Sequence, residues 1–84
     1  MMSNDRGLQD AHVRIGTKQT MRTVECGQAT EVYVALDCDH RLISKIVALC
    51  EKHSVNITYV DTMIELGEAC SIEVGAAMAA VIKE

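Results

Sequence analysis

The stretch from Thr30 to Val60, TEVYVALDCDHRLISKIVALCEKHSVNITYV, decides the fold. Its first part, Thr30–Leu36, is rich in β-branched and apolar side chains, as in a strand that is covered on both faces. Residues 40–53 repeat apolar side chains at helical spacing, and Asp39 can cap the start of that helix. A short strand, Asn56–Val60, follows. This order predicts a βαβ unit with parallel strands and a right-handed crossover.

Further helices and strands are predicted on both sides of this unit. Thr62 and Glu65 form a capping box, which predicts a short helix that ends near Cys70. The other expected elements are a helix Asp5–Ala11, a strand His12–Ile15, a helix Thr17–Cys26 and a strand Ala76–Ile82. Residues 1–4 are expected to fray. The alternation predicts an α/β fold, a three-layer α/β/α sandwich with a four-stranded mixed sheet, in one domain spanning residues 1–84.

The composition narrows the class of protein. The chain has 84 residues, 49% of them hydrophobic, and no proline, which indicates a folded domain rather than a disordered segment. The aromatic residues are Tyr33 and Tyr59, too few for binding a single strand on aromatic platforms. Residues 1–12 lack the apolar core of a signal peptide, and the longest apolar run, Ala76–Ile82, is too short to span a bilayer. We therefore expect a cytoplasmic protein with no membrane partner.

The charge is distributed unevenly along the chain. The formal net charge is −4, but residues 1–24 hold four basic and two acidic side chains, whereas residues 25–84 hold four basic and ten acidic ones. A compact basic patch on an acidic body suits a local contact with phosphate better than diffuse binding along a duplex.

The basic patch centres on RIGTKQTMR, residues 14–22. Thr17 is the expected N-cap of a helix, and Lys18 and Arg22 share a face of it because they lie four residues apart. Two cations beside the unpaired N–H groups of a first helical turn would form an anion-binding site. The alternative, a solvated helix face above a stripe of core residues, is the simpler interpretation of this stretch alone.

A second candidate site is the loop Ser71–Gly75. Its apolar residues Ile72 and Val74 flank the acidic Glu73. The two apolar side chains either tuck into the core or form a clamp for a flipped-out base, with Gly75 permitting close approach of the backbone. The sequence leaves both interpretations open.

Three segments form a joint pattern. They are Gly16-Thr17-Lys18-Gln19-x-x-Arg22-x-x-Glu25-x-Gly27, Glu31-Val32-x-Val34-Ala35-x-Asp37-x-Asp39 and Glu65-Leu66-Gly67-x-Ala69-Cys70-x-Ile72-Glu73-Val74-Gly75-Ala76-Ala77. In this order they resemble the ribosomal protein L7Ae family of kink-turn RNA-binding proteins, and most of all its short bacterial, YbxF-like members. The chain departs from the common pattern at three places: Lys18-Gln19, where many relatives have Asn-Glu; Arg22, where they have Lys; and Ser71, where glycine is common.

The resemblance implies a non-enzymatic protein that recognises a kink-turn, a sharply bent RNA duplex with a bulge beside tandem sheared G·A pairs. It implies three kinds of RNA contact. The edge of a guanine would be met by Lys18, Gln19 and Arg22. The remaining contacts would come from Arg14, Gly16 and Thr17 for phosphates, and from Ser71, Ile72, Glu73 and Val74 for the bulged nucleotide.

Other chemistries are weaker candidates. The run Asp37-Cys38-Asp39-His40 contains metal-ligand types, but neighbouring residues at a strand end point in alternate directions, so a helix cap is the better interpretation. No metal or cofactor is expected. No nucleophile stands at a catalytic spacing from a histidine, so we expect no enzyme activity. The cysteines lack zinc-site and C-x-x-C spacing and are expected to be reduced thiols: Cys26, Cys38, Cys50 and Cys70.

The leading hypothesis is a monomer that stabilises a kink-turn in ribosomal or regulatory RNA and associates with the ribosome. The alternative is a protein-interaction module that has kept the fold and lost RNA binding.

Overall fold

The computed structural model describes residues 12–83, so the predicted helix Asp5–Ala11 and the fraying of residues 1–4 lie outside the described residues. In chain order the elements are β1 (Val13–Ile15), α2 (Thr17–Glu25), β2 (Ala29–Ala35), α3 (His40–His53), β3 (Asn56–Val60), α4 (Met63–Ala69) and β4 (Met78–Ile82). The predicted bounds of α3 and β3 are confirmed at both ends, and those of the other elements differ by one or two residues.

The strands form one mixed sheet in the order β1-β4-β2-β3. β2 and β3 are parallel, as the βαβ pattern predicted, and β4 is antiparallel to both β1 and β2. β4 begins at Met78 rather than at Ala76, because the Ala76 N–H donates to the Met63 carbonyl oxygen at 3.0 Å instead of to a strand.

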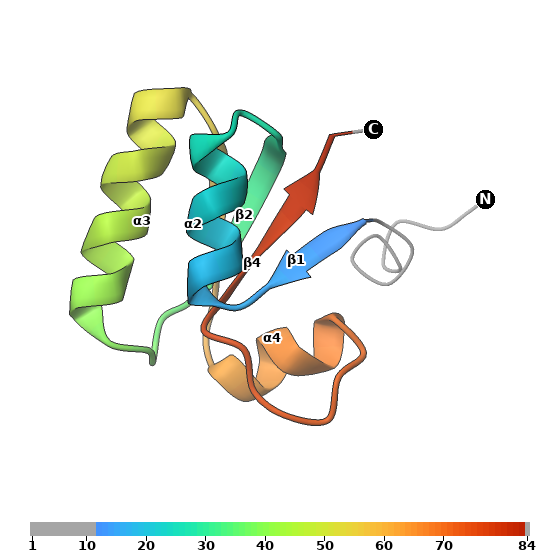
Figure 1. Ribbon diagram of the computed structural model, residues 1–84. Coiled ribbons are helices and arrows are strands. Elements are labelled where there is room, and N and C mark those ends of the chain that lie inside the picture. The colour runs from blue at the N-terminus through green and yellow to red at the C-terminus, as the bar shows by residue number, and fades with distance from the viewer. Residues whose placement is uncertain (1–11, 84) are drawn as a thin grey trace.

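Helices cover both faces of the sheet, which confirms the three-layer α/β/α fold. On one face α2 and α3 lie side by side (Figure 1), and their buried residues Val24, Ile46 and Cys50 share a core cluster with β2 and β4. On the other face Leu66 of α4 packs with Ala35 of β2 in a second, smaller cluster. α4 and the loop after it lie at the end of the molecule where α2 begins (Figure 1).

Each of the three described helices ends at a residue in the left-handed conformation. These residues are Gly27, Ser54 and Ser71, with φ of 73°, 59° and 64°. In each case the N–H of the following residue donates to the carbonyl five residues earlier in the chain, at 2.8 to 3.0 Å, which closes a Schellman motif. The predicted end of α2 at Cys26-Gly27 is therefore confirmed.

Aspartate side chains cap two helices. The Asp39 carboxylate accepts from the Arg41 N–H at 2.9 Å at the start of α3, as predicted. At the start of α4, the Thr62 hydroxyl accepts from the Glu65 N–H at 3.1 Å, and Asp37 Oδ1 accepts from the Met63 N–H at 2.8 Å. Asp37 thus ties the turn after β2 to α4, a contact that local sequence patterns did not predict.

We expect Asp37→Ala to lower the free energy of unfolding by about 1 kcal/mol, because a first-turn N–H of α4 loses its acceptor. Urea denaturation measures the change. Asp61→Ala is the matched control, since Asp61 is exposed and accepts no hydrogen bond from residues 12–83. Equal losses in the two variants would contradict the capping role of Asp37.

Candidate nucleic-acid interface

The start of α2 is shaped by Gly16. Its backbone has φ 107° and ψ 158°, a region open essentially only to glycine. In this conformation the Gly16 N–H donates to the Met78 carbonyl oxygen at 2.9 Å, and the Gly16 carbonyl accepts from the Thr20 N–H at 2.9 Å. The start of α2 is thereby attached to the start of β4.

The predicted N-cap at Thr17 is wrong. Gly16 occupies the N-cap position and Thr17 is already helical, because the chain enters the helix through the glycine conformation that the bond to Met78 requires. No side chain among the described residues caps this helix. The N–H groups of the first turn, at Thr17, Lys18 and Gln19, therefore have no partner within the helix.

α2 has one buried and one exposed face. Thr20, Thr23 and Val24 are buried, and the Thr23 hydroxyl donates to the Gln19 carbonyl oxygen at 2.8 Å. The side chains of Lys18 and Arg22 are exposed together with that of Gln19. Lys18 and Arg22 therefore lie on the solvent-exposed face of α2, as the sequence predicted.

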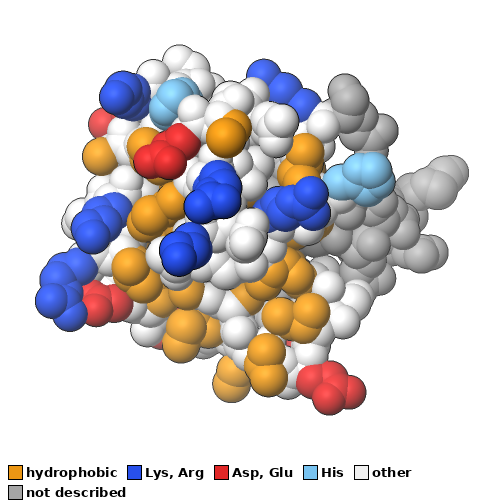
Figure 2. Space-filling model, viewed as in Figure 1, with side chains coloured by type: hydrophobic (Ala, Val, Ile, Leu, Met, Phe, Trp, Pro, Cys, Tyr) orange, Lys and Arg blue, Asp and Glu red, His pale blue; other side chains and the backbone are white. Residues whose placement is uncertain are grey.

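The charge at this helix end is positive and uncompensated. The first turn holds no acidic residue, and the one ion pair within residues 12–83 joins Asp39 to Arg41 at 3.0 Å. A lysine in the first turn opposes the helix dipole, so Lys18 adds to the positive potential there. Figure 2 shows the Lys and Arg side chains over α2 and β1, the latter carrying the exposed Arg14. A bound anion would relieve this repulsion.

The two apolar side chains of the loop Ser71–Gly75 differ in burial. Ile72 is half-buried and packs against the cluster of Leu66 and Ala76. Val74 is 70% exposed, and Glu73 between them is also exposed. Of the two interpretations, packing against the core therefore fits Ile72 better, and Val74 is the apolar side chain that the loop exposes.

The fold brings the two candidate segments to one end of the molecule. The loop leads through Ala76 and Ala77 into β4, whose first residue, Met78, accepts the hydrogen bond from Gly16. Figure 2 shows the basic side chains above and hydrophobic side chains below them, over α4 and its loop. Cations, free N–H groups and exposed apolar side chains, Val74 among them, thus lie on a continuous surface.

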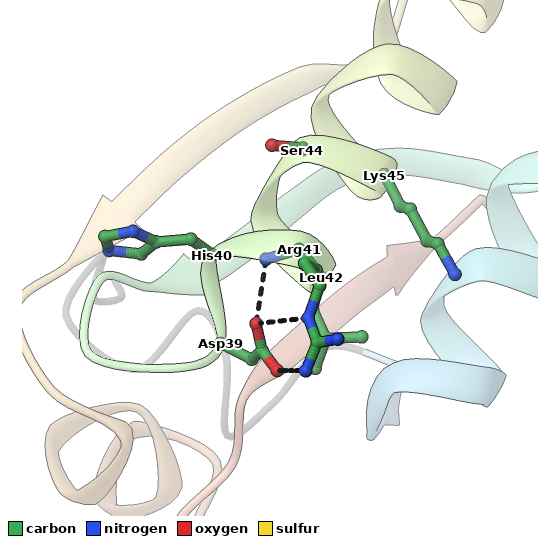
Figure 3. A pocket seen from close by; sticks show the side chains of 6 residues that line it. All are labelled: Asp39, His40, Arg41, Leu42, Ser44 and Lys45. Atoms are coloured by element: carbon green, nitrogen blue, oxygen red, sulfur yellow. Dashed lines mark hydrogen bonds and ion pairs between the residues drawn. The ribbon is translucent and has the colours of Figure 1, made fainter.

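An open depression of about 530 Å³ lies over the first turns of α3. Its lining residues are Asp39, His40, Arg41, Leu42, Ser44 and Lys45 (Figure 3). Lys45 extends toward α2 in this view, so cations of both helices border the same surface. Sequence reasoning missed these cations, although Arg41 and Lys45 repeat the spacing of Lys18 and Arg22.

The run Asp37-Cys38-Asp39-His40 serves packing and capping. Hydrogen bonds from the Arg41 side chain and then its N–H lower the pKa of Asp39, and Asp37 is bonded to Met63. Within residues 12–83 no three His, Cys, Asp or Glu residues are grouped to hold a metal ion.

Thiol chemistry has little support in the structure. Burial raises the pKa of Cys50 and Cys70, and burial followed by the carboxylates of Asp37 and Asp39 raises that of Cys38. A thiol with a raised pKa is a poor nucleophile at neutral pH. All four cysteines are free, and Cys26 is exposed.

In the described part of the chain, no helix has the length and hydropathy needed to cross a bilayer.

Comparison with known proteins identifies the family. The sequence model of the "Ribosomal protein L7Ae/L30e/S12e/Gadd45 family" matches residues 5–84. This chain belongs to that family. Within the L7Ae/L30e/S12e/Gadd45 family, "RNA-binding protein YbxF" of Geobacillus stearothermophilus is 46% identical over 82 residues, which cover 98% of this chain and 100% of that protein.

Further relatives agree in sequence and in fold. "RNA-binding protein BH0128" of Halalkalibacterium halodurans is 40% identical over 82 residues, 98% of this chain and 100% of that protein. The solved structure of the "Giardia lamblia 15.5kD RNA binding protein" has a TM-score of 0.81 and 26% identity, covering 95% of this chain and 66% of that chain.

The two apolar loop residues are expected to respond differently to truncation. Ile72→Ala should lower the free energy of unfolding by about 1 kcal/mol, because a half-buried side chain leaves the cluster around Leu66. Val74→Ala, the matched control, should leave stability unchanged, because this side chain is 70% exposed. Thermal and urea unfolding measure both. A larger loss for Val74→Ala would overturn this assignment.

Proposed function

We propose that this protein is a non-enzymatic RNA-binding protein of the cytoplasm that captures kink-turn RNA and associates with the ribosome. The observation that carries the proposal is the convergence at one end of the fold of an uncapped, basic helix start and a loop with an exposed apolar side chain. Membership of a family whose relatives are named RNA-binding proteins supports it.

The chemistry of the α2 start matches the edge of a guanine. Lys18 and Arg22 supply donors for guanine O6 and N7, and the Gln19 carbonyl oxygen can accept from a guanine amino group. Sheared G·A pairs turn these guanine edges outward, which makes them accessible to a short helix. The free first-turn N–H groups and Arg14 would hold phosphates beside them.

The charge pattern sets the orientation of the RNA. Lys18 and Arg22 are exposed on α2, and Lys45 of α3 extends toward that helix (Figure 3). α4, by contrast, exposes Glu65 and Glu68. The phosphate backbone would therefore run over α2 and the first turns of α3. The loop would approach the bulge with Val74, where bases rather than phosphates are presented.

The mechanism follows from differential affinity. A kink-turn exchanges between extended and bent forms, and a protein that binds only the bent form shifts the population toward it. The rigid attachment of α2 to β4 through Gly16 keeps the contacts for the bent form in place before binding.

Fluorescence transfer tests the proposed function. A short RNA with a kink-turn carries one dye at each end, and the control RNA has Watson–Crick pairs in place of its G·A pairs. Addition of the protein should bring the dyes together in the first RNA alone. No bending of either RNA at low salt with Mg²⁺ would contradict the proposal and favour the protein-interaction module.

Arg22→Ala should weaken binding of the kink-turn RNA by about 1–3 kcal/mol, as expected for loss of a guanine contact. Titration of the labelled RNA measures the affinity. Lys52→Ala is the matched control, because it removes one exposed positive charge from the last turn of α3, at the opposite end of that helix from Lys45. Equal losses for the two variants would show that only general charge attraction is at work.

A further inference from the structure

Gly67 stands in the middle of α4, a position where glycine weakens a helix. The residue is buried against the loop that follows the helix. A Cβ at this position would overlap the Val74 carbonyl oxygen and come within 3.1 Å of the Val74 carbonyl carbon and 3.2 Å of the Gly75 Cα. The loop backbone therefore lies directly on α4, at a distance that only glycine allows.

Contacts on both sides of this point hold the loop in place. The Ile72 N–H donates to the Gly67 carbonyl oxygen at 3.0 Å, and the Ile72 side chain packs on the cluster of Leu66. Beyond Val74, the Ala76 N–H donates to the Met63 carbonyl oxygen at 3.0 Å. Between these attachments the backbone is pressed against α4 while the Val74 side chain stays 70% exposed.

We propose that Gly67 is a positioning residue of the RNA site, which sets the height of the loop above α4 and thereby directs Val74 toward the bulged nucleotide. This inference rests on the proposed function. Gly67 itself touches no RNA in this arrangement. It acts through the backbone of Val74, so its effect on binding requires the Val74 side chain.

This positioning role accounts for a glycine inside a helix of only seven residues, where glycine is unfavourable. Alanine would stabilise α4 itself, but its methyl group would push the loop outward. A preorganised loop does not have to be ordered when RNA binds, so displacing it reduces affinity.

The test is a double-mutant cycle in RNA affinity. Gly67→Ala should weaken binding of the labelled kink-turn RNA about tenfold, in the range of a misplaced binding group. In a Val74→Ala background, Gly67→Ala should cause no further loss, because the group that it misplaces is absent. Ala48→Gly changes one exposed methyl group within α3 and no charge, so this control variant should bind as the wild-type protein does.

Separate outcomes distinguish the two proposals. Failure of the wild-type protein to bind the RNA contradicts the proposed function. Binding by the wild type with an unchanged affinity for Gly67→Ala, or with equal losses in both backgrounds, overturns the positioning role. If Gly67→Ala does not fold, Gly75→Ala takes its place in the same cycle, since a Cβ there would come within 3.2 Å of the Met63 Cβ and shift the same loop less.

Discussion

The hydrogen bond from the Gly16 N–H to the Met78 carbonyl oxygen joins the start of α2 to the start of β4. It requires a backbone conformation that only glycine adopts readily. Because β4 lies between β1 and β2, this bond places the basic helix start beside the N-terminal end of an inner strand of the sheet. The loop before β4 is brought to the same edge. The position of the basic helix start relative to the loop depends on this attachment.

The end of the molecule where α2 begins contains residues that weaken the helices in which they stand. Lys18 stands in the first turn of an uncapped helix, and Gly67 stands in the middle of α4. Each of these residues lowers the stability of its own helix, Lys18 by opposing the helix dipole and Gly67 by the larger conformational entropy of its unfolded backbone. Violations of local rules concentrate at functional sites, and their grouping here supports a binding role for this edge.

Two cores of different size support this edge. The larger cluster beneath α2 and α3 includes Val24 and Ile46, both fully buried, and holds the helices rigidly on the sheet. The smaller cluster beneath α4 includes Leu66 and half-buried Ile72. Asp37 links the sheet to α4, because its carboxylate, in the turn after β2, accepts from the Met63 N–H. The loop is therefore attached to the domain through α4, and its position follows that of this short helix.

The sequence by itself determined the order of elements in the βαβ unit, the bounds of α3 and β3 and the Asp39 cap, because each depends on neighbours within a few residues. It also determined the family resemblance, because three motifs occur in the same order along the chain. It also named both segments of the candidate site. Only the tertiary structure decided that Ile72 turns inward while Val74 remains exposed, and that Gly16 rather than Thr17 is the N-cap of α2. These outcomes depend on contacts between segments far apart in the chain, and such contacts are set by strand order and packing rather than by local pattern.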